Sequence, residues 1–317
     1  MKKTLHILIL LSFSVLIMSA HAQNDTIYVE TQITLKTSNG DIYGTLTTPK
    51  DFKKIPVALI IAGSGPTDRN GNNSMMKNNS LKKLAYELSK KGIATLRYDK
   101  RGIAGSVKAG INEFDLRFEN YIKDAKEWIQ LLKQDNRFSQ VIVIGHSEGS
   151  LIGMVASAAA DKYVSVAGAG RSADIIIKEQ LGNQPKIIQD LSFPIIDSLK
   201  SGYAVKKVPP MIATLFRPSV QPYIISWFKY DPEVLIKQVT IPTLIIQGTN
   251  DIQVSIKDAE ILSHANPNAR LVLINNMNHI FRIVEGDRQA NMVTYSNENL
   301  PIAEELATSI SDFILNK

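Results

Sequence analysis

The chain has 317 residues, which is enough for one large α/β domain or for one domain with an insertion. Hydrophobic residues make up 44% and charged residues 21% of it, values that are ordinary for a globular protein and exclude extended disorder. The formal net charge is +6, but no long basic run occurs and lysine-rich segments alternate with acidic residues, so the composition argues against nucleic-acid binding.

The first 22 residues have the pattern of a cleavable secretory signal peptide. Met1–Lys3 is a short basic start, Leu5–Met18 is almost entirely apolar, and Ser19–Ala22 places small residues where a signal peptidase inspects them. The alternative is an N-terminal membrane anchor, but the apolar stretch is too short to span a bilayer comfortably. We therefore predict a periplasmic or secreted protein, cleaved after Ala22 and without a stable membrane anchor. Loss of two lysines from the full-chain charge of +6 leaves +4.

The chain contains no cysteine. A bacterial lipoprotein needs a cysteine at its cleavage point, so the sequence excludes that kind of anchor. It also excludes disulfides, which an exported protein of this size does not require. Together with the leader, these absences favour a bacterial periplasm or secreted fraction.

The predicted strands begin with a hairpin. Two stretches of alternating polarity, 26–37 and 41–49, flank Ser38-Asn39-Gly40, and an Asn-Gly turn between such stretches is a strong hairpin signal. Residues 55–63 then form a continuous apolar run of strand length, which predicts a strand buried on both faces, as in a parallel sheet. A polar loop rich in glycine and asparagine follows at 64–79.

Strands and helices alternate along the rest of the chain. Apolar runs predict further strands at 93–99, 140–145, 163–170, 243–251 and 270–276. Helical spacing of apolar residues predicts helices at 81–88, 121–132, 255–265 and 306–314, and another from Ser150. This alternation indicates an α/β fold with an eight-stranded, mostly parallel sheet that begins with the antiparallel hairpin.

The region 171–238 breaks this alternation. It contains helical fragments interrupted by prolines, among them Pro185, Pro194 and Pro218, and it is rich in aromatic residues. We predict a helical insertion above the sheet, which divides a core made of 23–170 and 239–317.

One motif lies at a corner between a predicted strand and a predicted helix. Gly145-His146-Ser147-Glu148-Gly149 fits G-x-S-x-G, ends an apolar strand and opens a run of small residues. Such a corner strains the serine backbone, and the two glycines leave room for the adjoining backbones. The hydroxyl is then held above the sheet at a helix N-terminus, which favours developing negative charge. The alternative is a tight strand–helix turn with an incidental serine.

In this motif and its setting the chain resembles the α/β-hydrolase family, over almost all of its mature length. Within that family it is most similar to exported bacterial acyl esterases and serine-aminopeptidase-like hydrolases. The resemblance implies a triad in the order Ser…Asp…His, an oxyanion hole of two backbone amides, and a lid after the sixth strand, where 171–238 falls. Residues 97–106 resemble the family's Asp-x-Arg-Gly loop, in which we interpret Asp99 and Arg101 as a structural pair within the loop.

A serine nucleophile needs a base, and the mature chain has three histidines. His146 adjoins Ser147 on a constrained backbone, where its ring cannot easily reach back. His264 lies near the end of a predicted helix among charged neighbours. His279 follows a predicted strand at the carboxyl edge of the sheet, so we predict that it is the base; the alternative is a structural loop histidine.

The acid of the implied triad lies between Ser147 and His279. Asp251 closes a predicted strand at the same edge of the sheet, whereas the other aspartates of this interval have no such strand before them. We therefore predict that Asp251 fixes the imidazole tautomer and stabilises the imidazolium.

The implied oxyanion hole needs two amides. Glu148 follows the nucleophile and supplies one N–H, and we predict the other from Ser64, with Gly65 as the next choice. Family members often have His-Gly at this loop, whereas this chain has Ala62-Gly63. The Glu148 side chain stays ambiguous: it forms a salt bridge with a neighbour, or it meets a cationic group of the substrate.

These residues predict a serine hydrolase that cleaves carboxylic esters of small acyl or aryl groups through an acyl-enzyme. The same machinery serves a peptidase, an aminopeptidase or a thioesterase, and an insertion carboxylate (Glu179, Asp190 or Glu233) beside Ser147 would favour the aminopeptidase. The alternative from another class is a non-catalytic binding protein. The sequence indicates no metal and no cofactor, and the predicted partner is a small-molecule ester.

Overall fold

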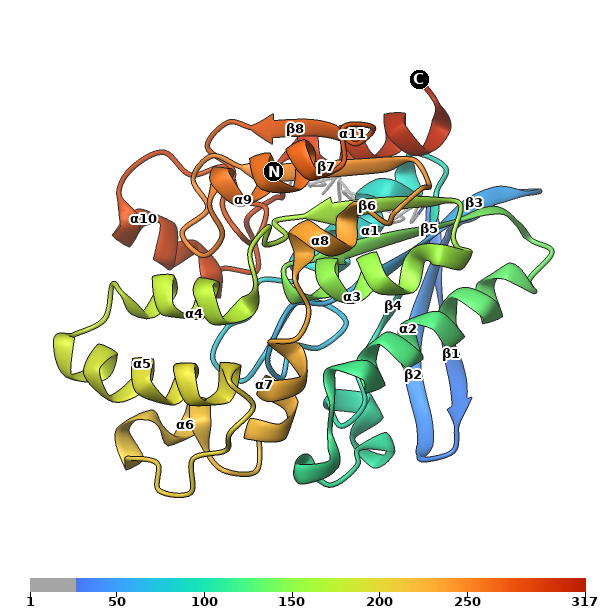
Figure 1. Ribbon diagram of the computed structural model, residues 1–317. Helices are drawn as coiled ribbons and strands as arrows, with labels where there is room; N and C mark the ends of the chain where they lie inside the picture. The colour runs from blue at the N-terminus through green and yellow to red at the C-terminus, as the bar shows by residue number, and fades with distance from the viewer. Residues whose placement is uncertain (1–26) are drawn as a thin grey trace, which may run out of the picture.

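The computed structural model describes residues 27–317, so the predicted signal peptide, 1–22, lies outside the described residues (Figure 1). One eight-stranded sheet runs through these residues in the order β1-β2-β4-β3-β5-β6-β7-β8. β1 and β2 are antiparallel, β2 is antiparallel to β4, and all later neighbours are parallel. The strands are β1 Tyr28–Thr37, β2 Gly40–Pro49, β3 Ile55–Ile61, β4 Ala94–Tyr98, β5 Phe138–His146, β6 Lys162–Val166, β7 Thr243–Gly248 and β8 Arg270–Ile274.

The predicted hairpin and parallel sheet are confirmed. The Asn-Gly turn joins β1 to β2 in the expected register, with Thr37 opposite Gly40. β4, β6 and β7 are buried along their whole lengths, because helices cover both faces of the sheet. The sequence thus identified the six later strands through continuous apolar runs, whereas alternation and the Asn-Gly turn identified β1 and β2.

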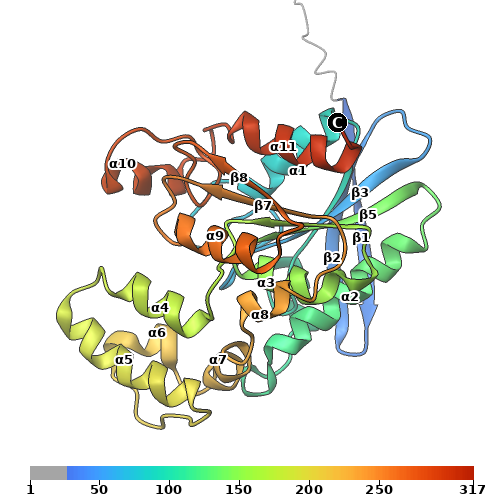
Figure 2. The same ribbon diagram turned by 45° about the horizontal axis from the view of Figure 1, so that its top comes forward.

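Helices cover both faces of the sheet (Figure 2), and an apolar core lies between the sheet and the helices on each face. On one face pack α2 (Phe118–Lys133), α3 (Glu148–Ala156) and α9 (Ile256–Ala265). On the other pack α1 (Ser80–Lys90) and α11 (Glu304–Leu315). A short helix that the sequence did not predict, α10 (Arg288–Val293), lies after β8. Burial on both faces fixes the strand ends, and therefore the loops that carry the polar residues.

The region between β6 and β7 is helical. Its helices are α4 (Ala173–Leu181), α5 (Lys186–Lys200), α6 (Ala213–Phe216), α7 (Gln221–Trp227) and α8 (Pro232–Ile236). Figure 1 shows α4 to α7 gathered on one side of the molecule, whereas α8 lies beside α3. That this segment acts as a lid stays a prediction.

Aromatic residues attach this insertion to the core. The ring of Phe118 on α2 stacks on Trp227 with centroids 6.1 Å apart, and Tyr223 meets the edge of Tyr121 at 5.7 Å. The aromatic content noted in the sequence is therefore partly used in packing α7 onto α2.

Within residues 27–317, no helix combines the length and the apolar character needed to cross a membrane.

Candidate active site

Ser147 occupies a strained corner between β5 and α3. Its backbone has φ 55° and ψ −120°, and a positive φ is uncommon for a residue other than glycine. Such strain costs of order 1–3 kcal/mol and persists only where the surroundings impose it. Here the Ser147 N–H donates to the Val166 carbonyl at 3.0 Å, and its own carbonyl accepts from the Ser150 N–H at 2.9 Å.

The two glycines of the motif are required by backbone crowding. A Cβ on Gly145 would lie 2.2 Å from the Gly149 carbonyl oxygen, and a Cβ on Gly149 would lie 2.3 Å from the Ile61 carbonyl oxygen. Both distances are far below contact distance, so only glycine lets α3 approach β5 and β3 this closely. The corner is thus set by packing beneath it, which holds the half-buried Ser147 at the carboxyl edge of the sheet.

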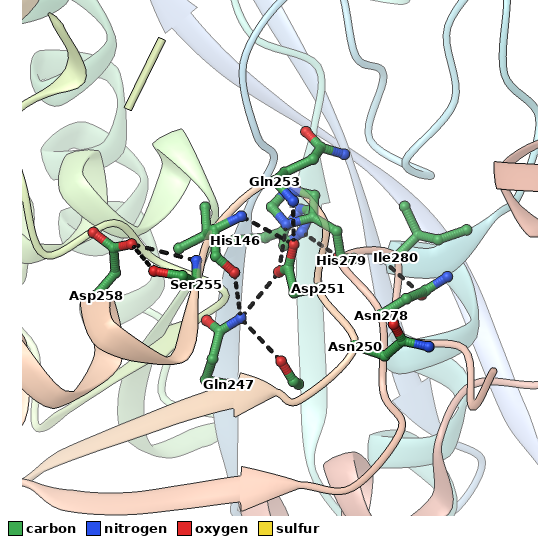
Figure 3. Close-up of polar contacts among 12 residues, drawn as sticks. His146, Gln247, Asn250, Asp251, Gln253, Ser255, Asp258, Asn278, His279 and Ile280 are labelled. Carbon is green, nitrogen blue, oxygen red and sulfur yellow. Dashed lines mark hydrogen bonds and ion pairs between the residues drawn. The ribbon is translucent and has the colours of Figure 1, made fainter. Parts of the chain in front are cut away.

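Asp251 and His279 are hydrogen-bonded at the same edge (Figure 3). Asp251 follows β7, and His279 lies in the loop after β8. The His279 Nδ1 lies 2.8 Å from the Asp251 Oδ2, and the two side chains are only 5% and 1% exposed. The structure therefore brings together two of the three residues of the predicted triad.

Four donors hold the Asp251 carboxylate. Besides His279, the Gln247 side-chain amide donates to Oδ2 at 3.1 Å, and the N–H groups of Gln253 and Val254 donate to Oδ1 at 2.8 and 3.0 Å. Burial by itself would raise the pKa of Asp251, but the charge and hydrogen bond of His279 and the two backbone donors hold that pKa below its ordinary value. Asp251 is therefore an oriented anion beside the imidazole.

His146 packs against His279 and holds its backbone. The His146 Nε2 lies 2.9 Å from the His279 carbonyl oxygen, and the two ring centroids are 4.8 Å apart. A carbonyl only accepts, so the Nε2 carries the proton. Burial first, and then the charge of His279, lower the pKa of His146 to about 3. The sequence excluded His146 as the base but gave no sign of this supporting contact.

The structure places His279 beside the residue that precedes Ser147. With its Nδ1 bound to Asp251, the ring nitrogen left for a reacting group is Nε2. Among residues 27–317, the Ser147 hydroxyl makes no hydrogen bond. Such bonds are often long in proteins without substrate and tighten when it binds, so this geometry is compatible with a base role.

The loop after β3 reaches the elbow, as an oxyanion site requires. A Cβ on Gly63 would lie 3.2 Å from the Ser147 Cβ. Ser64, the next residue, is exposed, and Gly65 beyond it has φ +71°. Glu148 is the first residue of α3, so its N–H has no partner within the helix. Both predicted donors thus lie next to the corner.

The ambiguity of the Glu148 side chain is resolved in favour of a salt bridge. Its Oε1 lies 3.0 Å from the Lys100 Nζ, its Oε2 accepts from the Tyr223 hydroxyl at 2.9 Å, and the side chain is 3% exposed. Both oxygens are therefore used inside the protein, and the carboxylate is closed to a substrate ammonium.

The insertion carboxylates likewise have partners. Glu179 pairs with Arg171 at 2.5 Å, Asp190 pairs with Lys186, and Glu233 pairs with Lys237 at 3.6 Å. Since each already has a local cation, none of the three is placed by these contacts as a counter-charge beside Ser147.

The interpretation of Asp99 and Arg101 as a pair was wrong. Asp99 binds Arg69 of the loop after β3 at 2.6 Å, whereas the Arg101 Nε donates to Asp124 of α2 at 2.7 Å. Both side chains are buried, and each forms an ion pair with the oppositely charged side chain that contacts it in space, not with its neighbour in the sequence. Their structural character stands, but they link separate elements.

Among the residues that the structure describes, no group of three or more histidines, aspartates or glutamates is arranged to hold a metal ion.

Comparison with known proteins shows which family the chain resembles. The model of the family described as serine aminopeptidase, S33, matches residues 75–208. Esterase EstD of Thermotoga maritima is 31% identical over 273 residues, which are 82% of this chain and 62% of that protein. The chain therefore spans less than two thirds of this relative's length.

Solved structures share the fold at low sequence identity. Est1E from Butyrivibrio proteoclasticus has a TM-score of 0.59 and 18% identity, over 90% of this chain and 99% of its own. The α/β hydrolase GrgF from Penicillium sp. sh18 has a TM-score of 0.60 and 16% identity, over 91% and 98%. With the sheet order, the strained serine corner and these relatives taken together, the chain belongs to the α/β-hydrolase family.

Proposed function

We propose that the protein is a serine hydrolase that cleaves carboxylic esters of small acyl or aryl groups. The observation that carries this proposal is the hydrogen bond between His279 and Asp251, at the same sheet edge as the strained Ser147. Ser147 is the nucleophile, His279 the base and Asp251 the acid that orients the base. The esterase relative, EstD, supports the reaction class.

The first half of the proposed reaction forms an acyl-enzyme. The Ser147 Oγ attacks the ester carbonyl carbon while the His279 Nε2 takes its proton, and Asp251 stabilises the imidazolium. The carbonyl electron pair moves onto oxygen, where the N–H groups of Ser64 and Glu148 stabilise it. When the tetrahedral intermediate collapses, the bond to the alcohol breaks, and His279 returns the proton to the departing alcohol.

The second half releases the acid. A water molecule attacks the acyl carbonyl and gives a proton to His279, and the same two amides stabilise the second oxyanion. The bond between the acyl carbon and the Ser147 Oγ then breaks, and Ser147 recovers its proton. Ester and water are consumed, acid and alcohol are formed, and no cofactor enters the balance.

A peptidase or aminopeptidase is the second candidate, and the match to the serine aminopeptidase family favours it. A thioesterase would use the same machinery. Against the aminopeptidase stands the observation that the buried Glu148 carboxylate is already bound by Lys100 and Tyr223. We therefore place the ester first.

The experiment compares turnover of p-nitrophenyl esters of increasing acyl length, an aryl ester such as a feruloyl ester, a thioester and aminoacyl anilides, with Ser147→Ala as the control. We expect the short or aryl esters to have the highest kcat/KM and the variant to fall to background. Faster anilide cleavage would overturn the ester assignment, and full activity in Ser147→Ala would remove Ser147 from the mechanism.

We also propose that 1–22 directs export and that 171–238 acts as a lid. The apolar leader with small residues at its end supports the first, and the position of the helical insertion between β6 and β7 supports the second. N-terminal sequencing of periplasmic or secreted protein should begin at Gln23. An intact leader on the protein in that fraction would contradict cleavage.

A further inference from the structure

Lys100, in the loop after β4, is a buried lysine with an unusual set of partners. Its Nζ donates to the Gly63 carbonyl oxygen at 2.7 Å and lies 3.0 Å from the Glu148 carboxylate. It also lies over the ring of Tyr121, 4.9 Å from the centroid, and the side chain is 1% exposed. A buried ammonium must have its donors engaged, so these contacts fix the Lys100 head in one place.

The Gly63 carbonyl belongs to the same peptide unit as the Ser64 N–H. This unit is planar and trans, so the carbonyl oxygen and the N–H point in opposite directions. Because Lys100 holds the carbonyl from the buried side, the Ser64 N–H is turned toward the exposed side of the loop, where Ser64 itself lies. A flip of this peptide would present a carbonyl in place of the N–H and leave the Lys100 ammonium without that acceptor.

The second partner of Lys100 carries the other proposed oxyanion donor. Glu148 supplies its backbone N–H at the start of α3, and its side-chain carboxylate binds Lys100. Tyr223 from α7 donates its hydroxyl to the other carboxylate oxygen, so both oxygens of Glu148 have a partner and Lys100 binds only one of them. One ammonium therefore connects the Gly63–Ser64 peptide, which carries one proposed oxyanion donor, with Glu148, which carries the other.

We infer that Lys100 is a positioning residue that fixes the Gly63–Ser64 peptide with its N–H toward the reacting carbonyl and joins it to Glu148. This inference rests on the proposed function and deepens it. The oxyanion develops only in the transition state, so loss of the correct peptide orientation lowers kcat and leaves KM nearly unchanged.

The test uses four variants of the full enzyme on its best ester. Removal of one oxyanion donor costs about 10²–10³-fold in kcat, so we expect Lys100→Met to lose about 100-fold in kcat with KM within about threefold. The neutral pair Lys100→Met/Glu148→Gln should lose the same amount, because both lack the bond to Gly63. Glu148→Gln alone keeps that bond and should lose about tenfold or less.

Lys162→Met is the matched control. Lys162 is also a buried lysine that donates to backbone carbonyls, those of Phe313 and Ile314 at 2.7 and 3.0 Å. It is the first residue of β6, so it lies at the amino ends of the parallel strands, away from Ser147 at their carboxyl ends. We expect it to lower the unfolding temperature and keep kcat within about twofold of wild type. The inhibition constant of a boronic acid, whose adduct with Ser147 places an oxygen in the hole, should rise in Lys100→Met by the factor that kcat/KM falls.

Two results would overturn the inference. One is an equal kcat loss in Lys100→Met and Glu148→Gln with recovery in the double variant, because the pair would then act through charge balance alone. The other is an unchanged kcat and boronic acid affinity in Lys100→Met. If Lys100→Met does not fold, the neutral double variant carries the comparison. Absence of ester turnover in the wild-type enzyme would instead contradict the proposed function, which keeps the two failures distinct.

Discussion

The two sides of Ser147 are supported in different ways. On the base side, formed by the loops after β7 and β8, the Asp251 carboxylate is held by donors from its own loop and from β7. On the oxyanion side, formed by the loops after β3 and β4, the support is a buried ion pair between Lys100 and Glu148. The Asp251 carboxylate is thus supported mainly by residues near it in the chain, whereas the oxyanion side depends on charges that distant segments bring together.

This difference has an energetic consequence. A carboxylate with several backbone and amide donors tolerates the loss of one of them, whereas removal of one partner from a buried ion pair strands the other charge and costs about 3–5 kcal/mol. Variants on the base side should therefore act mainly on the chemistry, and variants on the oxyanion side on chemistry and stability together.

Asp251→Asn is expected to have the largest effect on the base side. The asparagine oxygen would face the N–H groups of Gln253 and Val254, so its amide would point at the His279 Nδ1. His279 would then carry its proton on Nε2 and could not accept one from Ser147. We expect kcat to fall by about 10³–10⁴-fold with little change in KM.

Asp258→Asn is the control for this change. Asp258 is another buried aspartate, paired with Arg171 at 2.7 Å, and it has no contact with the proposed triad. It should cost stability and leave kcat within about threefold. Steady-state kinetics check both variants, and an Asp251→Asn enzyme that keeps a tenth of the wild-type kcat would contradict the assigned role.

His146→Gln tests the base side through the pH dependence of folding stability. The pKa of His146 is lowered to about 3, from an ordinary value of 6.5, by burial and by His279. Between these values the unfolded chain binds a proton that the folded chain does not, so stability falls as the pH falls through this window. Glutamine does not titrate, and its amide can donate to the His279 carbonyl.

We expect wild-type protein to lose about 3 kcal/mol more unfolding free energy than His146→Gln between pH 7 and pH 4. The lowered pKa of Asp251 contributes stability that is lost as the pH falls through the ordinary value of 3.8, but Asp251 is present in both proteins, so this contribution cancels in the comparison. Urea unfolding at both pH values measures the difference. Equal losses in the two proteins would show that His146 is not buried in its neutral form.

Tyr223→Phe should have the smallest effect on catalysis. It removes the hydroxyl that binds Glu148 and keeps the ring packed against Phe118 and Tyr121. Because Lys100 still holds Gly63, we expect kcat to change by about threefold or less, while the unfolding free energy falls by about 2 kcal/mol.

Tyr230→Phe is the matched control on the same insertion, because its hydroxyl binds Glu119 at an exposed position, 3.1 Å away. It should cost less than about 0.5 kcal/mol, since exposed polar contacts contribute little. Denaturant unfolding and ester kinetics check both. A larger kcat loss in Tyr223→Phe than in Lys100→Met would move the main support of the oxyanion side from the lysine to the insertion.

Sequence reasoning was strongest where the signal is local. Alternation and an Asn-Gly turn predicted the hairpin, continuous apolar runs predicted the later strands, and the ends of two of these pointed to Asp251 and His279. The short α10 was missed because six residues of mixed polarity show no helical period. The motif located Ser147, but the chain order of residues says nothing of the contact that His146 makes with His279.

The supports on the oxyanion side could not be predicted for a physical reason. Lys100 is a lysine after a strand, and most lysines in such positions are exposed. Its burial depends on Gly63, Glu148 and Tyr121 meeting in space, from three separate segments. The wrong pairing of Asp99 with Arg101 has the same origin, because nearness in sequence does not select the partner of a buried charge.

The most direct test of a working Ser147 is mass spectrometry of the protein after exposure to a fluorophosphonate, which reacts with an activated serine. We predict one adduct per chain, located on the peptide that contains Ser147, absent from Ser147→Ala and formed far more slowly by Asp251→Asn. Absence of an adduct on the wild-type protein, or an adduct that persists in Ser147→Ala, would contradict a serine hydrolase built on this corner of the sheet.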